Sequence, residues 1–282
     1  MSELLLIYSL AFVLGLLFGS FFNVVIHRLP IMMERDWKRQ SKAFLGLSEA
    51  EEDQARFDLS TPPSRCPNCE RPIRWYENLP VISYLAMKGR CTGCQKSISP
   101  RYPLVELLTA ALTLITVWHF GISLHTAFLA VFVWLLIILT FIDFDTQLLP
   151  DSLTLPGLWL GLLSNWYFEW VPLDDALLGA VFGYLSLWSV FWLFKLLTGK
   201  EGFGYGDFKL LAMMGAWLGW LQLPVILFLS CLLGAILGGI VVISQRGQEN
   251  PTQIAFGPYL AIAGLIALFF GNELMSWYLS GF

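Results

Sequence analysis

The feature that most constrains this chain is a succession of apolar segments long enough, or nearly long enough, to cross a lipid bilayer. A bilayer core about 30 Å thick takes about 20 apolar residues in an α-helix, and a helix satisfies its own backbone polar groups there. Of the 282 residues, 56% are hydrophobic and 13% are charged, whereas soluble domains average about 45–50% and about 25%. We therefore predict an all-α polytopic membrane protein with about eight transmembrane helices. The predicted spans are residues 4–26, 103–121, 124–142, 153–169, 175–195, 207–221, 223–244 and 254–279.

The basic residues are concentrated in one polar segment. Of the 17 Lys and Arg residues, 13 lie between Arg28 and Arg101. Short loops rich in Lys and Arg stay in the cytoplasm, so the segment between the first and second spans is predicted to be cytoplasmic and the N-terminus to lie outside. The expected organisation is a first transmembrane helix over 1–26, a cytoplasmic loop over 27–102 and a transmembrane domain over 103–282. The expected partner is the lipid bilayer and not nucleic acid; the oligomeric state is left open.

Two aspartates stand where apolar segments meet polar turns. Asp143 closes the apolar run of the third span, and Asp207 follows Gly202-Phe-Gly204-Tyr-Gly206. A carboxylate at membrane depth is costly and indicates a functional site. Solvation at a helix end is the alternative, but a solvated acid does not require glycines that admit close approach of backbone or a partner. Two such carboxyls brought together can share one proton and activate water, which indicates a membrane-embedded aspartic protease.

The polar loop carries two C-x2-C pairs, with 21 residues between them. Such pairs supply four thiolates to one tetrahedral Zn²⁺ ion. Two disulfides are the alternative, but the charge pattern places the loop in the reducing cytoplasm. Because four protein ligands close the coordination shell, the predicted zinc is structural and not catalytic. Its predicted ligands are Cys66, Cys69, Cys91 and Cys94.

Other patterns limit the remaining possibilities. Residues 31–60 indicate short charged helices on the membrane surface. The glycines before Asp207 do not fit the dinucleotide pattern G-x-G-x-x-G, and a P-loop and a plausible Ser-His-Asp order are both absent from the sequence. Two other function classes stay open: a non-enzymatic membrane assembly factor whose loop recruits a partner, and a proton-coupled transporter. A transporter predicts polar groups at mid-membrane on several spans, whereas the acids here cluster at one face.

Several segments together resemble bacterial prepilin peptidases. The similarity runs through the end of the first span, the four cysteines, and the two aspartate segments. The tetrapeptide Gly204-Tyr-Gly206-Asp207 also resembles the wider G-x-G-D class of intramembrane aspartic proteases that includes presenilin. The other segments that carry the resemblance are Gly19-Ser-Phe-Phe-Asn-Val-Val-Ile-His-Arg-Leu-Pro30, Gly89-Arg-Cys91 and Ile98-Ser-Pro-Arg-Tyr-Pro-Leu-Val-Glu106.

The resemblance implies an enzyme of the bacterial inner membrane that acts at the cytoplasmic face. It would remove the leader of type IV prepilins and type II secretion pseudopilins. Asp143 and Asp207 would be the catalytic dyad, because Asp143, unlike its rival Asp145, lies seven residues before Pro150. Gly204 and Gly206 would form the active-site loop.

The resemblance also implies a second activity. Similar enzymes methylate the new N-terminal residue, usually Phe, with S-adenosylmethionine, and Gly89 matches a position tied to that activity. A peptidase that lacks the methyltransferase activity stays an alternative. The basic leader of the substrate calls for acidic groups, for which Glu70, Glu77 and Glu106 are candidates.

Overall fold

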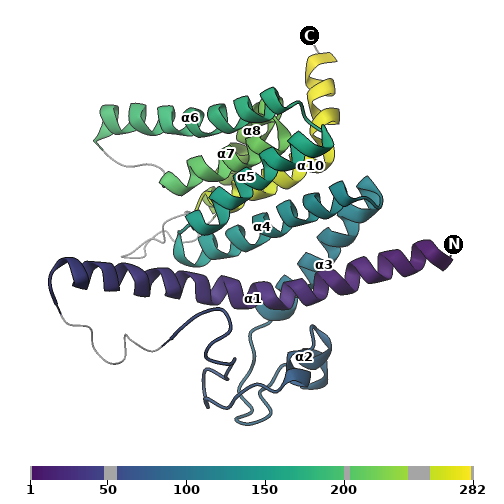
Figure 1. Ribbon diagram of the computed structural model, residues 1–282, viewed down its shortest axis with the longest axis vertical. Helices are drawn as coiled ribbons and strands as arrows, with labels where there is room; N and C mark the ends of the chain where they lie inside the picture. The colour runs from purple at the N-terminus through teal and green to yellow at the C-terminus, as the bar shows by residue number, and fades with distance from the viewer. Residues whose placement is uncertain (1, 48–55, 200–203, 241–254, 281–282) are drawn as a thin grey trace. The chain divides into compact units, whose positions relative to one another are not determined.

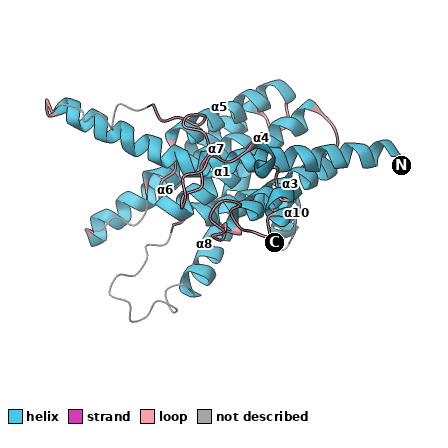
Figure 2. Ribbon diagram, turned by 90° about the horizontal axis from the view of Figure 1, so that it is seen from below, coloured by secondary structure: helices cyan, strands magenta, loops and turns pink. Residues whose placement is uncertain are grey.

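The protein is helical throughout the part that the computed structural model describes, residues 2–47, 56–199, 204–240 and 255–280. Figure 2 shows helices and loops and no strand in these ranges. Each of the eight predicted spans is helical over most of its described residues, and in this part of the chain six helices are long and apolar enough to cross a membrane. The predicted all-α polytopic fold is confirmed. The chain divides into two compact units, residues 1–122 and 123–282, which are described separately.

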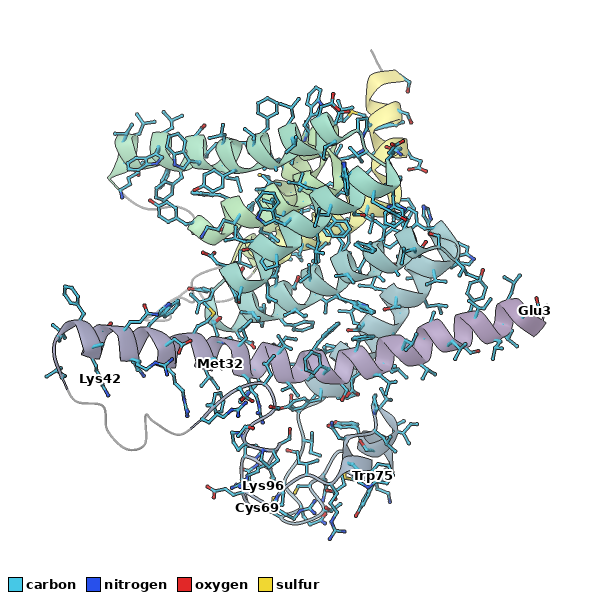
Figure 3. All side chains as sticks on the ribbon, in the orientation of Figure 1. Glu3, Met32, Lys42, Cys69, Trp75 and Lys96 are labelled. Carbon is cyan, nitrogen blue, oxygen red and sulfur yellow. The ribbon has the colours of Figure 1, made fainter. Side chains whose placement is uncertain are left out.

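The first unit begins with a helix much longer than the predicted span. The helix α1 (Ser2–Phe44) continues through Pro30, and Figure 3 labels Glu3, Met32 and Lys42 along it. The helix does not end at residue 26, where the predicted apolar span ends, because the polar segment that follows contains strong helix formers. An ion pair between Glu34 and Lys38, 2.6 Å long and one turn apart, adds local support. The rest of the unit is η2 (Trp75–Asn78), α2 (Ile82–Ala86) and α3 (Arg101–Phe120). The acidic stretch at 48–55 lies outside the described residues, as does Gly202.

Small residues bring α1 and α3 together. A Cβ atom added to Gly15 would lie 2.5 Å from the Cα of Ala110, and one added to Gly19 would lie 2.7 Å from the Cα of Glu106. Glycines one turn apart therefore let the two backbones approach closely, as in membrane helix pairs generally.

The second unit is built around a short buried helix, α7 (Tyr205–Leu218). From Asp207 to Leu218 every residue except Lys209 is buried, and Figure 1 shows α7 beside α5 and α6. At about 21 Å α7 is too short to cross a bilayer, and its neighbours cover it instead. Those neighbours and the other helices are α4 (Leu124–Thr146), α5 (Asp151–Phe168), α6 (Leu173–Thr198), η3 (Trp220–Gln222), α8 (Leu223–Leu233), the π-helical η4 (Gly234–Gly238) and α10 (Gly257–Ser280).

Close contacts and buried hydrogen bonds hold α7 in place. Gly179 of α6 meets Gly215 of α7 so closely that a Cβ on Gly179 would lie 2.2 Å from the Gly215 carbonyl oxygen. The side chain of Asn165 in α5 donates to the main-chain oxygens of Ala216, at 2.9 Å, and Trp217, at 3.1 Å. These bonds satisfy carbonyls that the end of a helix leaves without partners. The helix that carries Asp207 is thus fixed along its length.

Candidate active site and metal centre

Asp143 is buried at the end of its own helix. It lies in the last turn of α4 with 5% of its surface exposed. A negative charge is unfavourable at a helix C-terminus, where the backbone dipole is itself negative. The structure supplies compensation from elsewhere: the main-chain N–H of Gly257, the first residue of α10, donates to Asp143 Oδ2 at 3.0 Å. The N-terminus of α10, where the helix dipole is positive, therefore stabilises the carboxylate that the C-terminus of α4 destabilises.

Asp207 is buried at the start of its helix. It is the third residue of α7, with 6% of its surface exposed. The main-chain N–H of Gly204 donates to Asp207 Oδ2 at 3.2 Å, as at a helix N-cap. Asp207 and Asp143 are close enough for their charges to interact. The second unit thus brings the two predicted carboxylates together in a largely water-excluded place.

The neighbouring aspartates differ from this pair in exposure. Asp145 is exposed although it lies only two residues from Asp143. Asp151, at the start of α5, accepts from Lys209 Nζ at 2.7 Å through both carboxylate oxygens. Because Lys209 follows Asp207 by two residues, this ion pair ties the two aspartate segments together. Nothing in the sequence around Asp151 indicates this contact.

The two glycines of the G-x-G-D tetrapeptide have different surroundings. A Cβ on Gly206 would lie 2.7 Å from Leu149 Cβ, in the segment that follows Asp143. A Cβ on Gly204 would meet, among the described residues, only Asp207 Oδ2 at 3.6 Å and the Gly206 nitrogen at 3.9 Å. At Gly206 the two aspartate segments therefore pack too closely to admit a side chain without a shift. Leu149 also lies near Gly257, whose added Cβ would be 3.4 Å from Leu149 Cδ1.

The four predicted metal ligands converge in the first unit. The Sγ atoms of Cys66, Cys69, Cys91 and Cys94 all lie within 4.8 Å of one another. Those of Cys66 and Cys94 are 3.8 Å apart, close to the separation of about 3.8 Å that Zn–S bonds of about 2.3 Å give in a tetrahedron. All four thiols are free, so the disulfide alternative is not realised. The donor set can hold a metal ion that prefers four sulfur ligands.

The two cysteine pairs, which share the C-x2-C spacing, form equivalent turns. In the first turn the main-chain N–H of Glu70 donates to the Cys66 oxygen at 2.9 Å, and in the second Gln95 donates to the Cys91 oxygen at 2.9 Å. Both donors have left-handed backbone, with φ values of 55° and 59°. In the second turn the N–H groups of Cys94 and Gly93 lower the pKa of the Cys91 thiol to about 6. A thiolate is the form that binds metal.

A buried carboxylate links these turns to the other residues of the segment from Cys66 to Lys96, here called the cysteine module. Glu77 Oε1 accepts from Arg71 Nη2 at 2.7 Å and from the Thr92 hydroxyl at 2.6 Å, and Oε2 accepts from the Arg74 N–H at 3.0 Å. These donors, the Thr92 hydroxyl foremost, lower the pKa of Glu77 to about 2. Figure 3 labels Cys69, Trp75 and Lys96 on this module. Glu77 thus accepts its hydrogen bonds from residues of the cysteine module. Glu106 likewise accepts a hydrogen bond from the main-chain N–H of Val81, at 2.7 Å.

Gly89 connects α2 to the second cysteine turn. Its φ of +65° lies in the left-handed region, which glycine adopts without a steric penalty. Its N–H donates to the Tyr84 oxygen at 2.8 Å, and its own oxygen accepts from the Ile98 N–H at 2.7 Å. An added Cβ would lie 2.9 Å from the Tyr84 hydroxyl oxygen. The position is therefore restricted in both conformation and space.

Comparison with known proteins places these two units in a family of membrane peptidases. Residues 13–120 match the bacterial peptidase A24 N-terminal domain, and residues 130–239 match the type IV leader peptidase family. Proteins with the name prepilin leader peptidase/N-methyltransferase are similar over nearly the whole chain. The Pseudomonas aeruginosa protein is 56% identical over 96% of this chain and 95% of its own. The Pseudomonas putida protein is 55% identical over 94% and 91%, and that of Neisseria gonorrhoeae is 48% identical over 96% and 94%.

The chain belongs to the prepilin leader peptidase/N-methyltransferase family. The resemblance stated from the sequence is confirmed, and with it the enzyme class. No solved structure matches the chain.

Proposed function

We propose that this chain removes the leader peptide of type IV prepilins and type II secretion pseudopilins, with Asp143 and Asp207 as the catalytic dyad. The observation that carries the proposal is a pair of buried carboxylates, at the end of α4 and the start of α7, that lie close enough for their charges to interact and each accept a main-chain N–H. The name that the relatives share supports prepilin as the substrate. It also supports N-methylation as a second activity, which we assign to the new N-terminal residue, usually Phe.

The dyad performs acid–base chemistry on water and the scissile amide. Because two adjacent carboxylates repel each other, one holds a proton while the other is ionised. The ionised group takes a proton from a water molecule, whose oxygen attacks the carbonyl carbon. The protonated group polarises the carbonyl oxygen and supplies the proton that the leaving amine receives when the C–N bond breaks. The titration belongs to the pair and not to one residue.

The orientation in the membrane supports this assignment. We infer a multi-pass protein of the inner membrane with a periplasmic N-terminus and a cytoplasmic zinc loop, because the basic residues are concentrated in that loop. Asp143 and Asp207 then lie toward the cytoplasm, where the basic leader of a prepilin is located. A reporter-fusion map tests the orientation, and a periplasmic location for residues 56–99 would contradict it.

Zn²⁺ is the metal that best fits the four thiols. Zinc is tetrahedral with sulfur ligands, and a four-cysteine shell leaves no open position for substrate or water. The ion would fix the turns at Cys66 and Cys91 and take no part in hydrolysis. Metal analysis of the purified protein should give one zinc per chain, and a metal-free protein of full activity would refute the site.

The methyl donor we propose is S-adenosylmethionine. Its sulfonium would give a methyl group to the new N-terminal amine: a C–N bond forms, the C–S bond breaks and the amine loses a proton. Gly89→Ser should reduce this transfer, because it strains the left-handed turn and crowds the Tyr84 hydroxyl. Cleavage should stay largely intact, since the dyad belongs to the other unit. Loss of both activities would show that Gly89 is needed for the fold as a whole.

The experiment that tests the whole proposal is incubation of the purified protein with a prepilin and S-adenosylmethionine, followed by mass spectrometry. The expected product lacks the leader and carries one additional methyl group. Leader loss without methylation would indicate a peptidase alone. An unchanged prepilin, under conditions in which a relative cleaves it, would favour the non-enzymatic assembly factor.

A further inference from the structure

The hydrogen bond between Gly257 and Asp143 joins parts of the chain 114 residues apart. Gly257 is buried at the start of α10, and its N–H donates to Asp143 Oδ2 at 3.0 Å. It lies outside the two segments that the family models match. Asp207, in contrast, accepts its main-chain bond from Gly204, three residues away. The orientation of Asp143 therefore depends on where α10 docks, whereas Asp207 is held by its own segment.

The start of α10 is suited to a carboxylate. The Phe256 oxygen accepts from the N–H groups of Tyr259, at 3.1 Å, and Leu260, at 3.2 Å, so the helix begins directly after Phe256. The N–H groups of the first turn have no partner within the helix, and Pro258, the second residue, has none to offer. The Gly257 N–H is thus available, and it points at Asp143.

Space, and not backbone conformation, requires glycine at this position. A Cβ on Gly257 would lie 2.5 Å from Asp143 Oδ2 and 3.1 Å from its Cγ. Contacts below 3.0 Å force one partner to move, and the atom that would move here is the carboxylate oxygen itself. Alanine would therefore displace the reacting group while it leaves the rest of α10 free to form.

We propose that Gly257 is a positioning residue for leader cleavage. Its N–H fixes one oxygen of Asp143, and a side chain at this position would occupy the space of that oxygen. The inference rests on the proposed role of Asp143. It adds the start of α10 to the active site as a third element, beside the ends of α4 and α7. Gly257 acts on the reaction only through Asp143.

The first test compares two glycines of the same helix. Gly257→Ala should lower kcat for prepilin cleavage about 100-fold, the effect of a displacement of about 1 Å, and change KM less than about 2-fold. Gly264→Ala is the matched control, because its Cβ would meet the flexible end of Met214, with Sδ at 2.8 Å, and not the dyad. Methyl transfer to a pilin supplied without its leader should be unchanged in both variants. Wild-type kcat in Gly257→Ala would overturn the proposal.

A second test measures the contact without catalysis. In detergent, Gly257→Ala should lower the melting temperature in the wild-type background and have little effect in an Asp143→Ala background, which lacks the crowded oxygen. Such a dependence is the signature of a direct interaction. An equal loss in both backgrounds would refute the contact. Suppose that Asp143→Asn cleaves prepilin normally, whereas Gly257→Ala lowers the melting temperature only when Asp143 is present. The proposed catalytic role of Asp143 would then be wrong, but the contact between Gly257 and Asp143 would be supported.

Discussion

The prediction that separates the structure most sharply from the sequence motif concerns Gly206. In the motif Gly204 and Gly206 are equivalent, but among the described residues only Gly206 would meet, at less than 3.0 Å, an atom that cannot move away by itself. A Cβ on Gly206 would lie 2.7 Å from Leu149 Cβ. A Cβ atom is attached to the backbone, so relief requires a shift of the segment between Asp143 and Asp151 relative to α7. Gly206→Ala should therefore change the spacing of the dyad.

The size of the effect follows from the contact. To restore an ordinary separation of 3.4 Å from 2.7 Å, the two segments must part by about 0.7 Å. Overpacking of this kind costs about 1–3 kcal/mol, which outweighs the gain of at most about 1 kcal/mol that alanine brings to a helix. A misplacement near 1 Å lowers a rate about 100-fold. We expect a fall in kcat of about 10- to 100-fold.

The assay is initial-rate cleavage of a prepilin in detergent, with Gly204→Ala as the control two residues away. Gly204→Ala should keep kcat within about 3-fold, since alanine at a helix N-cap costs about 1 kcal/mol or less against glycine. Zinc content and methyl transfer to a pilin without its leader should be normal in both variants. Equal losses in the two variants, or a normal rate in Gly206→Ala, would refute the steric reasoning.

Three further predictions concern the supports of the two units. Glu77→Gln should speed zinc loss to a chelator by about 10-fold or more, because hydrogen bonds to a charged group are worth about 1.5–3 kcal/mol. Glu70→Gln is the control and should not change the rate, since Gln occupies the equivalent place in the second turn. Equal rates of zinc loss in the two variants would contradict this prediction. Lys209→Met should cost about 1 kcal/mol or less and leave cleavage within a few-fold, because Asp151 is 55% exposed; a loss as large as that of Asp143→Asn would place Lys209 in the chemistry. Asn165→Ala should destabilise the protein by about 1–3 kcal/mol, because it leaves two buried carbonyls unpaired. An unchanged melting temperature in detergent would contradict this prediction.

Much of the site could be predicted because its functional groups are side chains that occur in short, recognisable sequence patterns. Cys66 and Cys69 are separated by two residues, as are Cys91 and Cys94, and this pattern predicts that the four thiols converge as one set of ligands. The helices could be located from apolar length alone. Asp143 and Asp207 were exceptional because they are acidic residues at the ends of apolar runs.

What the sequence could not reveal depends on the main chain or on distant contacts. The bond from Gly257 to Asp143 is made by an N–H group that every residue except proline carries, across 114 residues. The sequence signal was only the Gly-Pro pair that opens the final span. The extension of α1 to Phe44 was missed because the apolar run ends near residue 26, whereas helix-forming residues continue beyond it. The buried position of α7 was hidden for a similar reason, because an apolar segment indicates burial without showing whether lipid or protein covers it.

The central claim is that the buried pair Asp143 and Asp207 carries leader cleavage. The direct measurement is mass spectrometry of a prepilin after incubation with three purified variants, Asp143→Asn, Asp207→Asn and Asp145→Asn, each confirmed to be folded and to bind zinc. The account predicts no leader loss with the first two variants and substantial cleavage with Asp145→Asn, whose parent side chain is exposed. Normal cleavage by Asp143→Asn or by Asp207→Asn would contradict it.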